Sequence, residues 1–182
     1  MSEDGFRRRD LFLLWRRRDD AGDPPPPPSL LRPPGAIVEH LFVDACQRCG
    51  RCVEVCPRQA IAPLEASAGA AAGTPVIRAR QAPCVVCAGL ACTQACPSGA
   101  LTRVAVFDVE MGTAEVDRAR CLTFRGEACR ACVDACPVPG ALLESDGHPV
   151  VQASCIGCGV CEHVCPTPEA AIVVRPARRV LR

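Results

Sequence analysis

The hydrophobic positions of the chain come in short runs, which are separated by cysteine-rich stretches. The runs at residues 75–79, 101–106, 114–117, 150–152 and 171–174 have the length and the apolar, often β-branched composition that strands favour. Each cysteine-rich stretch is followed by a small apolar segment that suits a short helix. The pattern therefore predicts a strand, a cysteine loop, a short helix and a strand, repeated four times.

The N-terminal part of the chain lacks this pattern and is expected to form an arm. Apolar residues recur at helical spacing between residues 7 and 18, which predicts a short helix there. A run of prolines follows, so residues 23–35 are expected to form an extended polyproline spacer. Two interpretations remain open: a disordered tail, or a docking element that inserts its apolar face into a partner.

The composition offers little material for a conventional core. The 182 residues include 16 cysteines but no Tyr, one Trp and five Phe. Bound metal clusters can supply the missing stabilisation. All 21 basic residues are Arg, which we attribute to codon composition, and the formal net charge of +1 gives no indication of a nucleic-acid partner. If the sixteen cysteines bind four oxidised 4Fe-4S clusters, each cluster adds a charge of about −2, and the net charge of the protein falls to about −7.

The sequence predicts a cytoplasmic protein without a transmembrane span. No stretch reaches the roughly 18 apolar residues that a span needs. Arg7–Arg9 and the apolar run Leu11–Trp15 resemble a twin-arginine export signal, but the run is shorter than a signal requires. A periplasmic location is the alternative if this stretch acts as an atypical signal. Thiols stay reduced in the cytoplasm, which favours metal binding over disulfides.

The cysteines form four units, and each unit ends in Cys-Pro. The first and fourth units read C-x2-C-x2-C-x3-C-P, the spacing of bacterial four-iron ferredoxins. The second unit has gaps of x2, x4 and x3, and the third has gaps of x7, x2 and x3. Zinc sites prefer cysteine pairs separated by a dozen or more residues, so iron–sulfur clusters are favoured. The units contain Cys46, Cys49, Cys52 and Cys56; Cys84, Cys87, Cys92 and Cys96; Cys121, Cys129, Cys132 and Cys136; and Cys155, Cys158, Cys161 and Cys165.

The spacing predicts a different role for each cysteine of a unit. The first three cysteines bind three irons of one cluster, and the fourth is carried away on the start of a short helix to ligate the other cluster of a pair. The proline that follows has a fixed φ and no amide hydrogen, so it turns the chain away from the cluster. Glycines let backbone amides approach the sulfur atoms. These residues are Pro57, Pro97, Pro137 and Pro166, and Gly50, Gly157 and Gly159.

The shared spacing of the outer units predicts nested pairing, with unit one paired with unit four and unit two with unit three. Sequential pairing, one with two and three with four, is the rival. Cys121 is the least certain ligand, because its long gap could leave it as a free loop cysteine. Nested pairing predicts four ligand sets: Cys46, Cys49, Cys52 and Cys165; Cys155, Cys158, Cys161 and Cys56; Cys84, Cys87, Cys92 and Cys136; and Cys121, Cys129, Cys132 and Cys96.

The expected fold is α+β, with two nested ferredoxin-like modules that each hold two clusters and follow an extended proline-rich arm. Residues 66–73 are expected to form a flexible loop or linker. His163 lies between two cysteines, and two interpretations remain open: it lines a cluster, or it faces solvent or packing neighbours. The predicted division is 1–36 for the arm, 37–68 and 149–176 for the outer module, 69–148 for the inner module and 177–182 for a basic tail.

The region from Cys84 to Ala177 resembles the NapG/MauM group of ferredoxin-type proteins of nitrate and methylamine respiration. The matching stretches are "PCVVC…CTQACPSGAL", "MGTAEVDRARCL", "CRACVDACP" and "CIGCGVCEHVC…PEAAIVV". The second unit also resembles the iron–sulfur subunits of molybdenum oxidoreductases, whose four clusters pair in the nested way. The Arg-rich arm is more similar to NapF, the cytoplasmic relative.

The resemblance implies a protein that passes single electrons through four 4Fe-4S clusters and has no substrate of its own. The implied partners are redox proteins, either a molybdenum oxidoreductase or a quinol-linked membrane complex. The basic C-terminal stretch is expected to be solvated, with peripheral membrane contact as the alternative. The NapF resemblance implies a second function, a maturation factor that binds a molybdoenzyme precursor through the arm.

Overall fold

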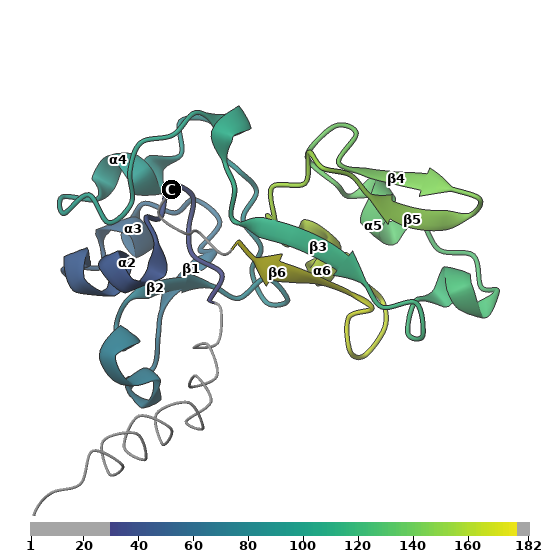
Figure 1. Ribbon diagram of the computed structural model, residues 1–182, viewed down its shortest axis with the longest axis horizontal. Coiled ribbons are helices and arrows are strands. Elements are labelled where there is room, and N and C mark those ends of the chain that lie inside the picture. The colour runs from purple at the N-terminus through teal and green to yellow at the C-terminus, as the bar shows by residue number, and fades with distance from the viewer. Residues whose placement is uncertain (1–29, 178–182) are drawn as a thin grey trace, which may run out of the picture.

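The chain folds into two lobes that follow one another in sequence (Figure 1). A computed structural model describes residues 30–177. We call residues 30–105 the first module and residues 109–177 the second module. A short 3-10 helix, η2 (Val106–Asp108), connects them. Among residues 30–177, no helix has the length and apolar character needed to cross a membrane.

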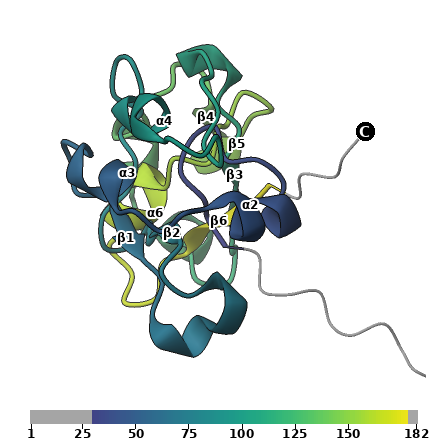
Figure 2. The ribbon, with the colours of Figure 1, turned by 90° about the vertical axis from the view of Figure 1, so that its left-hand side faces the viewer.

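The first module combines a small hairpin with three helices. Its antiparallel hairpin places Ile61 opposite Ile77, and a single bridge between Ala36 and Leu101 brings the ends of the module together. Two of its helices, α3 and α4, pack against each other and lie side by side in the end view (Figure 2). The elements are α2 (Glu39–Ala45), α3 (Arg51–Glu54), β1 (Ile61–Pro63), η1 (Ala66–Ala71), β2 (Pro75–Ile77) and α4 (Ala91–Ala95).

The second module repeats this plan with longer strands. One antiparallel pair joins the two ends of the module, with Gly112 opposite Pro176 and Val116 opposite Ile172. A second pair forms a hairpin in which Leu143 faces Val150. The elements are β3 (Gly112–Val116), η3 (Leu122–Arg125), α5 (Ala131–Asp134), β4 (Leu142–Ser145), β5 (His148–Val151), α6 (Val160–Val164) and β6 (Ile172–Pro176).

Each module has its own apolar core. In the first module, Phe42 of α2 is fully buried and the guanidinium of Arg32 lies over its ring, 4.6 Å from the centroid. The Arg32 Nε donates a hydrogen bond of 2.9 Å to Glu39, and its Nη1 donates one of 2.9 Å to the Thr74 hydroxyl. The second core is smaller and contains Leu142, Ile172 and several alanines together with cysteines.

Four of the five predicted strands are present, with shifted ends, as β2, β3, β5 and β6. The prediction for residues 101–106 is wrong, because only Leu101 forms a bridge and the chain then enters η2. The sequence pattern missed α2, β1, β4 and the 3-10 helices η1, η2 and η3. Both missed strands belong to hairpins, where three or four residues are enough to make the pairing.

The predicted arm ends too late. Leu31 and Ala36 are part of the first core, and Pro33 and Pro34 are fully buried, so residues 31–36 are not a solvated spacer. The predicted helix at residues 7–18, the rest of the polyproline run and residues 178–182 lie outside the described residues. Arg175 is the first residue of the basic C-terminal stretch, residues 175–182; it lies in β6, its side chain is exposed as expected, and it pairs with Glu115.

The predicted boundary between residues 68 and 69 is also wrong. It falls inside the loop that joins β1 to β2, and these strands pair with each other. The loop, residues 66–73, is therefore the turn of a hairpin within one module, and not a linker between two modules. The Arg48 side chain fastens it, since Nε donates to the carbonyl of Ala72 at 2.9 Å and Nη2 to that of Ala70 at 2.8 Å.

Candidate iron–sulfur cluster sites

The four cysteine units share one local geometry. In each unit the third cysteine is the second residue of a short helix, and the fourth lies one or two residues beyond the end of that helix. The fourth cysteine was expected at the start of a helix, and this detail is wrong. A residue in the left-handed conformation turns the chain into three of these helices: Gly50 before α3, Leu90 before α4 and Gly159 before α6.

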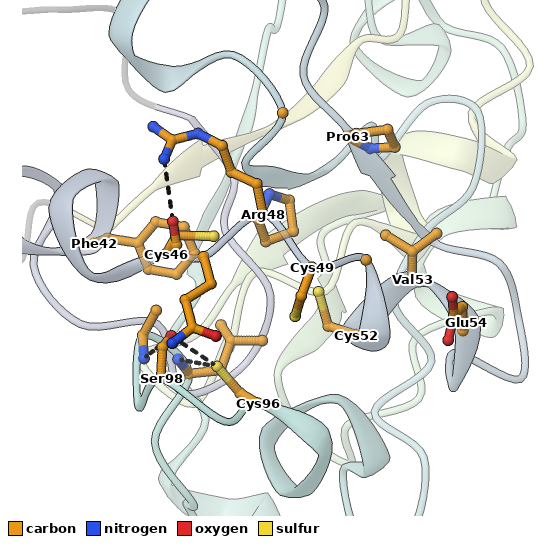
Figure 3. Close-up of a pocket in the computed structure, with 16 residues that line it drawn as sticks. Phe42, Cys46, Arg48, Cys49, Cys52, Val53, Glu54, Pro63, Cys96 and Ser98 are labelled. Atoms are coloured by element: carbon orange, nitrogen blue, oxygen red, sulfur yellow. Dashed lines mark hydrogen bonds between the residues drawn. The ribbon is translucent and has the colours of Figure 1, made fainter.

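The first cavity lies between α3 and the stretch that follows α4, and has a volume of about 290 Å³. Figure 3 shows the cysteine side chains of units one and two that face it. Cys49 is exposed, and the Arg48 side chain lies at the rim, where its Nη1 donates to the Cys46 carbonyl at 3.2 Å. We call this site 1; its cysteines are Cys46, Cys49, Cys52 and Cys96.

Two further cavities have the same composition, three cysteines from one unit and the fourth cysteine of the neighbouring unit. One lies in the first module, where Leu90 and Ile61 complete its apolar wall. The other lies in the second module against Leu142 and Val174. We call them site 2, with Cys56, Cys84, Cys87 and Cys92, and site 3, with Cys136, Cys155, Cys158 and Cys161.

The remaining cysteines all lie in the second module, and packing and charge interactions connect them. Charge interactions from Cys121 and Cys129 act on Cys132, and Cys165 belongs to the same apolar core as Cys121 and Cys132. The long gap after Cys121 is filled by η3, so the structure brings Cys121 to its unit. By equivalence with the first module we call this group site 4: Cys121, Cys129, Cys132 and Cys165.

These groupings contradict the predicted nested arrangement. The first triplet meets Cys96 of unit two, whereas the nested arrangement predicted Cys165 of unit four. The physical reason lies in the connection between units one and two. The β1–β2 hairpin folds the chain back on itself, so α4 returns to pack on α3. In the second module the β4–β5 hairpin does the same for α5 and α6.

The donor sets fit cubane clusters. A 4Fe-4S cluster takes four thiolates, one on each iron, around a body that needs space. Each of the first three sites arranges four cysteines around a cavity of its own. Within residues 30–177, no group of three or more His, Cys, Asp or Glu side chains converges closely enough to hold a single metal ion.

Backbone amides point at the sulfur atoms of three of the four fourth cysteines. The N–H of Ala60 donates to Cys56 at 3.3 Å, that of Leu101 to Cys96 at 3.4 Å and that of Ala171 to Cys165 at 3.3 Å. Such hydrogen bonds favour a thiolate and tune the reduction potential of a cluster. These donors were not predicted from the sequence, although each lies in the small apolar segment after a Cys-Pro pair.

Side-chain hydroxyl groups also lie close to the sulfur atoms of two of the fourth cysteines. The Ser98 hydroxyl lies 3.6 Å from the sulfur of Cys96, and the Thr167 hydroxyl lies 3.1 Å from that of Cys165. Both residues stand two positions after the fourth cysteine of a unit. A hydroxyl residue after Cys-Pro was therefore a signal in the sequence that could have been used.

The third and fourth cysteines differ in acidity. Burial, followed by charge repulsion from neighbouring cysteines, raises the pKa of Cys52 to about 11 and that of Cys92 to about 12. Burial also acts on Cys96 and Cys165, but hydrogen bonds outweigh it and lower the pKa of both. Metal ligands must be deprotonated, so cluster binding displaces protons from the third cysteines.

The predicted glycines and prolines lie at the sites, and two of the glycines also make close contacts with other segments. A Cβ on Gly157 would come within 2.4 Å of the Gly112 backbone, and one on Gly159 within 2.4 Å of the Ala79 side chain. These two glycines therefore allow close approach of other segments; they also line site 3, as Gly50 lines site 1. The prolines Pro57, Pro97, Pro137 and Pro166 are all exposed at the exit from a unit.

Comparisons with known proteins agree with this geometry. A family of 4Fe-4S dicluster domains matches residues 45–100, and two families of 4Fe-4S binding domains match residues 119–139 and 148–168. The match at residues 45–100 joins units one and two in one domain, as the structure does.

Two curated relatives are similar over most of their length. The methylamine utilization ferredoxin-type protein MauM from Paracoccus denitrificans (strain Pd 1222) is 42% identical over 159 residues, which are 80% of this chain and 71% of the relative. The ferredoxin-type protein NapG from Escherichia coli (strain K12) is 41% identical over 162 residues, which are 80% of this chain and 70% of the relative.

Cysteine-lined cavities in two ferredoxin-like modules define an iron–sulfur protein of the ferredoxin class, which carries several 4Fe-4S clusters and transfers electrons. Within this class, the chain belongs to the family of ferredoxin-type proteins that includes NapG and MauM.

Proposed function

We propose that the protein passes electrons along four clusters arranged in the order site 1, site 2, site 3 and site 4. The ligands are the sixteen cysteines grouped above. When bound, a 4Fe-4S cluster accepts or gives up one electron at a time. The chain's own residues hold the sites in a row, exclude water from the inner ones and set their charge environment.

The contact between the two modules supports this order of the sites, because it joins site 2 to site 3. The Cys84 amide of site 2 donates a hydrogen bond of 3.0 Å to the Cys158 carbonyl of site 3. The charge of Cys158 also acts on the Cys84 thiol, although burial is the main cause that raises its pKa to about 11. Sites 2 and 3 are therefore neighbours across the joint between the modules.

Within each module, the short helices connect neighbouring sites. Helix α3 carries Cys52 of site 1, and Cys56 of site 2 follows it. Helix α6 likewise carries Cys161 of site 3, and Cys165 of site 4 follows it. Each helix thus holds two sites within a few residues of one another, which makes sites 1 and 4 the two ends of the row.

Site 1 is the end best suited to exchange electrons with a partner. Among the sixteen cysteines, all of which lie in the described part of the chain, Cys49 alone is exposed. The corresponding cysteines of sites 2 and 3, Cys87 and Cys158, are partly or fully buried. Electron transfer falls steeply with distance, so a partner gains most from docking where a ligand reaches the surface.

The partner we propose is an oxidoreductase, either a molybdenum enzyme or a quinol-linked membrane complex. The support is the membership of a family that includes a methylamine utilization protein and NapG. The cytoplasmic location stays a prediction, since the segment on which it rests lies outside the described residues. The alternative function in enzyme maturation rests on the same segment, and no observation favours it.

Anaerobic analysis of iron and acid-labile sulfide tests the cluster count. Four cubane clusters require about sixteen irons and as many sulfides per chain. Stepwise reduction followed by EPR should then give signals that add up to four spins per chain. A count near twelve irons per chain would remove site 4 from the proposal, because Cys121 is the least regular ligand of that site. A protein that contains zinc and no iron would overturn the proposed function.

A further inference from the structure

One side chain of the first module is bound entirely by the second. Arg80 follows β2 and is half-buried at the joint between the modules. Its Nη1 donates to the carbonyl oxygens of Glu162 at 2.7 Å, Cys165 at 2.8 Å and His163 at 3.3 Å. Its Nη2 donates to the carbonyl of Thr167 at 2.9 Å. The guanidinium therefore occupies the C-terminal end of α6.

The carbonyls at this end need a donor. The last turn of a helix leaves carbonyl oxygens without partners inside the helix, and they carry partial negative charge. Helix α6 spans five residues, Val160–Val164, so much of its length is an end of this kind. A planar guanidinium with several donors suits such a set of acceptors better than an ammonium does.

The contact is reciprocal and lies beside two cluster sites. The Nδ1 of His163 donates to the Arg80 carbonyl at 3.0 Å, which assigns this histidine to the joint. On the adjoining stretch, Ala79 lies against Gly159 so closely that an alanine would not fit there. Four residues after Arg80, the Cys84 amide of site 2 bonds to the Cys158 carbonyl of site 3.

We propose that Arg80 is a positioning residue that holds site 2 against site 3 and places a cation beside the ligands of sites 3 and 4. It binds the segment between Cys161 and Cys165, the cysteines through which α6 serves these two sites. The inference rests on the cluster sites proposed above. Arg80 thereby has two measurable effects, one on the distance between the modules and one on the reduction potentials of the second module.

The test compares Arg80→Gln and Arg80→Lys with Arg78→Gln in the full-length protein loaded with iron and sulfide. Arg78 lies two residues away, is exposed, and pairs with Glu65 of its own module, so its replacement removes a charge without touching the joint. Three readouts are used: the magnetic interaction between clusters in the reduced EPR spectrum, the reduction potentials from EPR-monitored titration, and hydrogen exchange of the Cys84 amide.

In Arg80→Gln we expect weaker magnetic interaction between the modules and about tenfold faster exchange at Cys84. Removal of a cation destabilises the more negative reduced state, so the potentials of sites 3 and 4 should move to lower values. Arg80→Lys keeps the charge but makes fewer hydrogen bonds, so its potentials should stay closer to the wild type while exchange at Cys84 is still accelerated.

The outcomes separate this proposal from the one on which it rests. Wild-type protein without four clusters would overturn both. Wild-type protein with four clusters, together with an Arg80→Gln variant that matches Arg78→Gln in all three readouts, would overturn the role of Arg80 alone. If Arg80→Gln fails to take up its clusters, Arg80→Lys decides: faster exchange at Cys84 than in Arg78→Gln supports the proposal, and equal exchange refutes it.

Discussion

The two modules hold similar sites but close their ends in different ways. In the second module, β3 and β6 pair along five residues each. In the first, the corresponding segments meet only at the bridge between Ala36 and Leu101. The first module compensates with buried side chains, because Leu31, Arg32 and Phe42 pack beneath that bridge. The second module thus closes its ends by backbone pairing, and the first module by the burial of side chains.

This difference should also decide how far each module depends on its cofactors. The first core contains a fully buried Phe together with Leu, Ile and Met side chains. The buried part of the second core consists of three alanines, Leu142 and Ile172 with two cysteines. A core of such small volume gains little from burial alone, so its fold relies more on metal binding.

The largest expected effect follows from removing the clusters. Oxidation and chelation of iron under denaturant-free conditions should abolish most amide protection in residues 109–177, while the amides around Phe42 keep a measurable part of theirs. Hydrogen exchange with mass spectrometry resolves the two regions. Equal loss of protection in both modules would mean that the buried aromatic core gives the first module no independence.

The next effect tests the pairing of units in the first module. Cys49 and Cys96 belong to one site in the structure, so Cys49→Ser with Cys96→Ser should remove one cluster and leave about twelve irons. Nested pairing would place them in two sites and leave about eight. The matched control combines Cys49→Ser with Cys165→Ser, for which we expect the loss of two clusters. Iron analysis of anaerobic protein separates the two values.

A smaller effect is expected from the aromatic side chain that replaces strand pairing. Phe42→Ala should destabilise the first module by about 3–5 kcal/mol, because it empties a fully buried position. Phe107 is 85% exposed, so Phe107→Ala provides a control of the same chemistry and should change stability by less than about 0.5 kcal/mol. Denaturant unfolding of the anaerobic proteins measures both. Similar values for the two variants would contradict the proposed role of Phe42.

The smallest effect concerns a single hydrogen bond at site 1. The Ser98 hydroxyl accepts from the Ala100 amide at 3.4 Å, which leaves its hydrogen free for Cys96. A hydrogen bond of about 1 kcal/mol corresponds to about 40 mV for one electron. Ser98→Ala should therefore lower the potential of site 1 by about that amount. Ser67 lies in η1, away from the cysteines, and Ser67→Ala should leave all potentials unchanged.

The cysteine units could be predicted from the sequence, because ligand spacing is a local property, whereas the short helix was expected after each unit and lies within it. Cys52 and Cys56 must lie near each other in any fold, and their spacing is readable from the chain. The pairing of units was wrong because it was inferred from similar spacing. What decides it is the β1–β2 hairpin, and a three-residue strand such as Ile61–Pro63 leaves little trace in the pattern.

The predicted end of the N-terminal arm was wrong for a different reason. Pro33 and Pro34 look like the end of a polyproline spacer, and nothing in their neighbours shows that they are covered. Their burial depends on contacts with residues far along the chain, such as the bridge to Leu101. Arg80 was overlooked for the same reason, since its partners lie more than eighty residues away.

The helices that link neighbouring sites have a consequence for damage by oxygen. Loss of a cubane from site 3 would release Cys161, and because Cys165 follows the same helix, α6, we expect the adjacent site to be disturbed as well. We therefore expect the loss of one cluster to destabilise the neighbouring cluster in the same lobe. At the joint the lobes are connected by hydrogen bonds, and each ligand helix carries cysteines of one lobe only, so we expect the loss of a cluster to disturb the other lobe less.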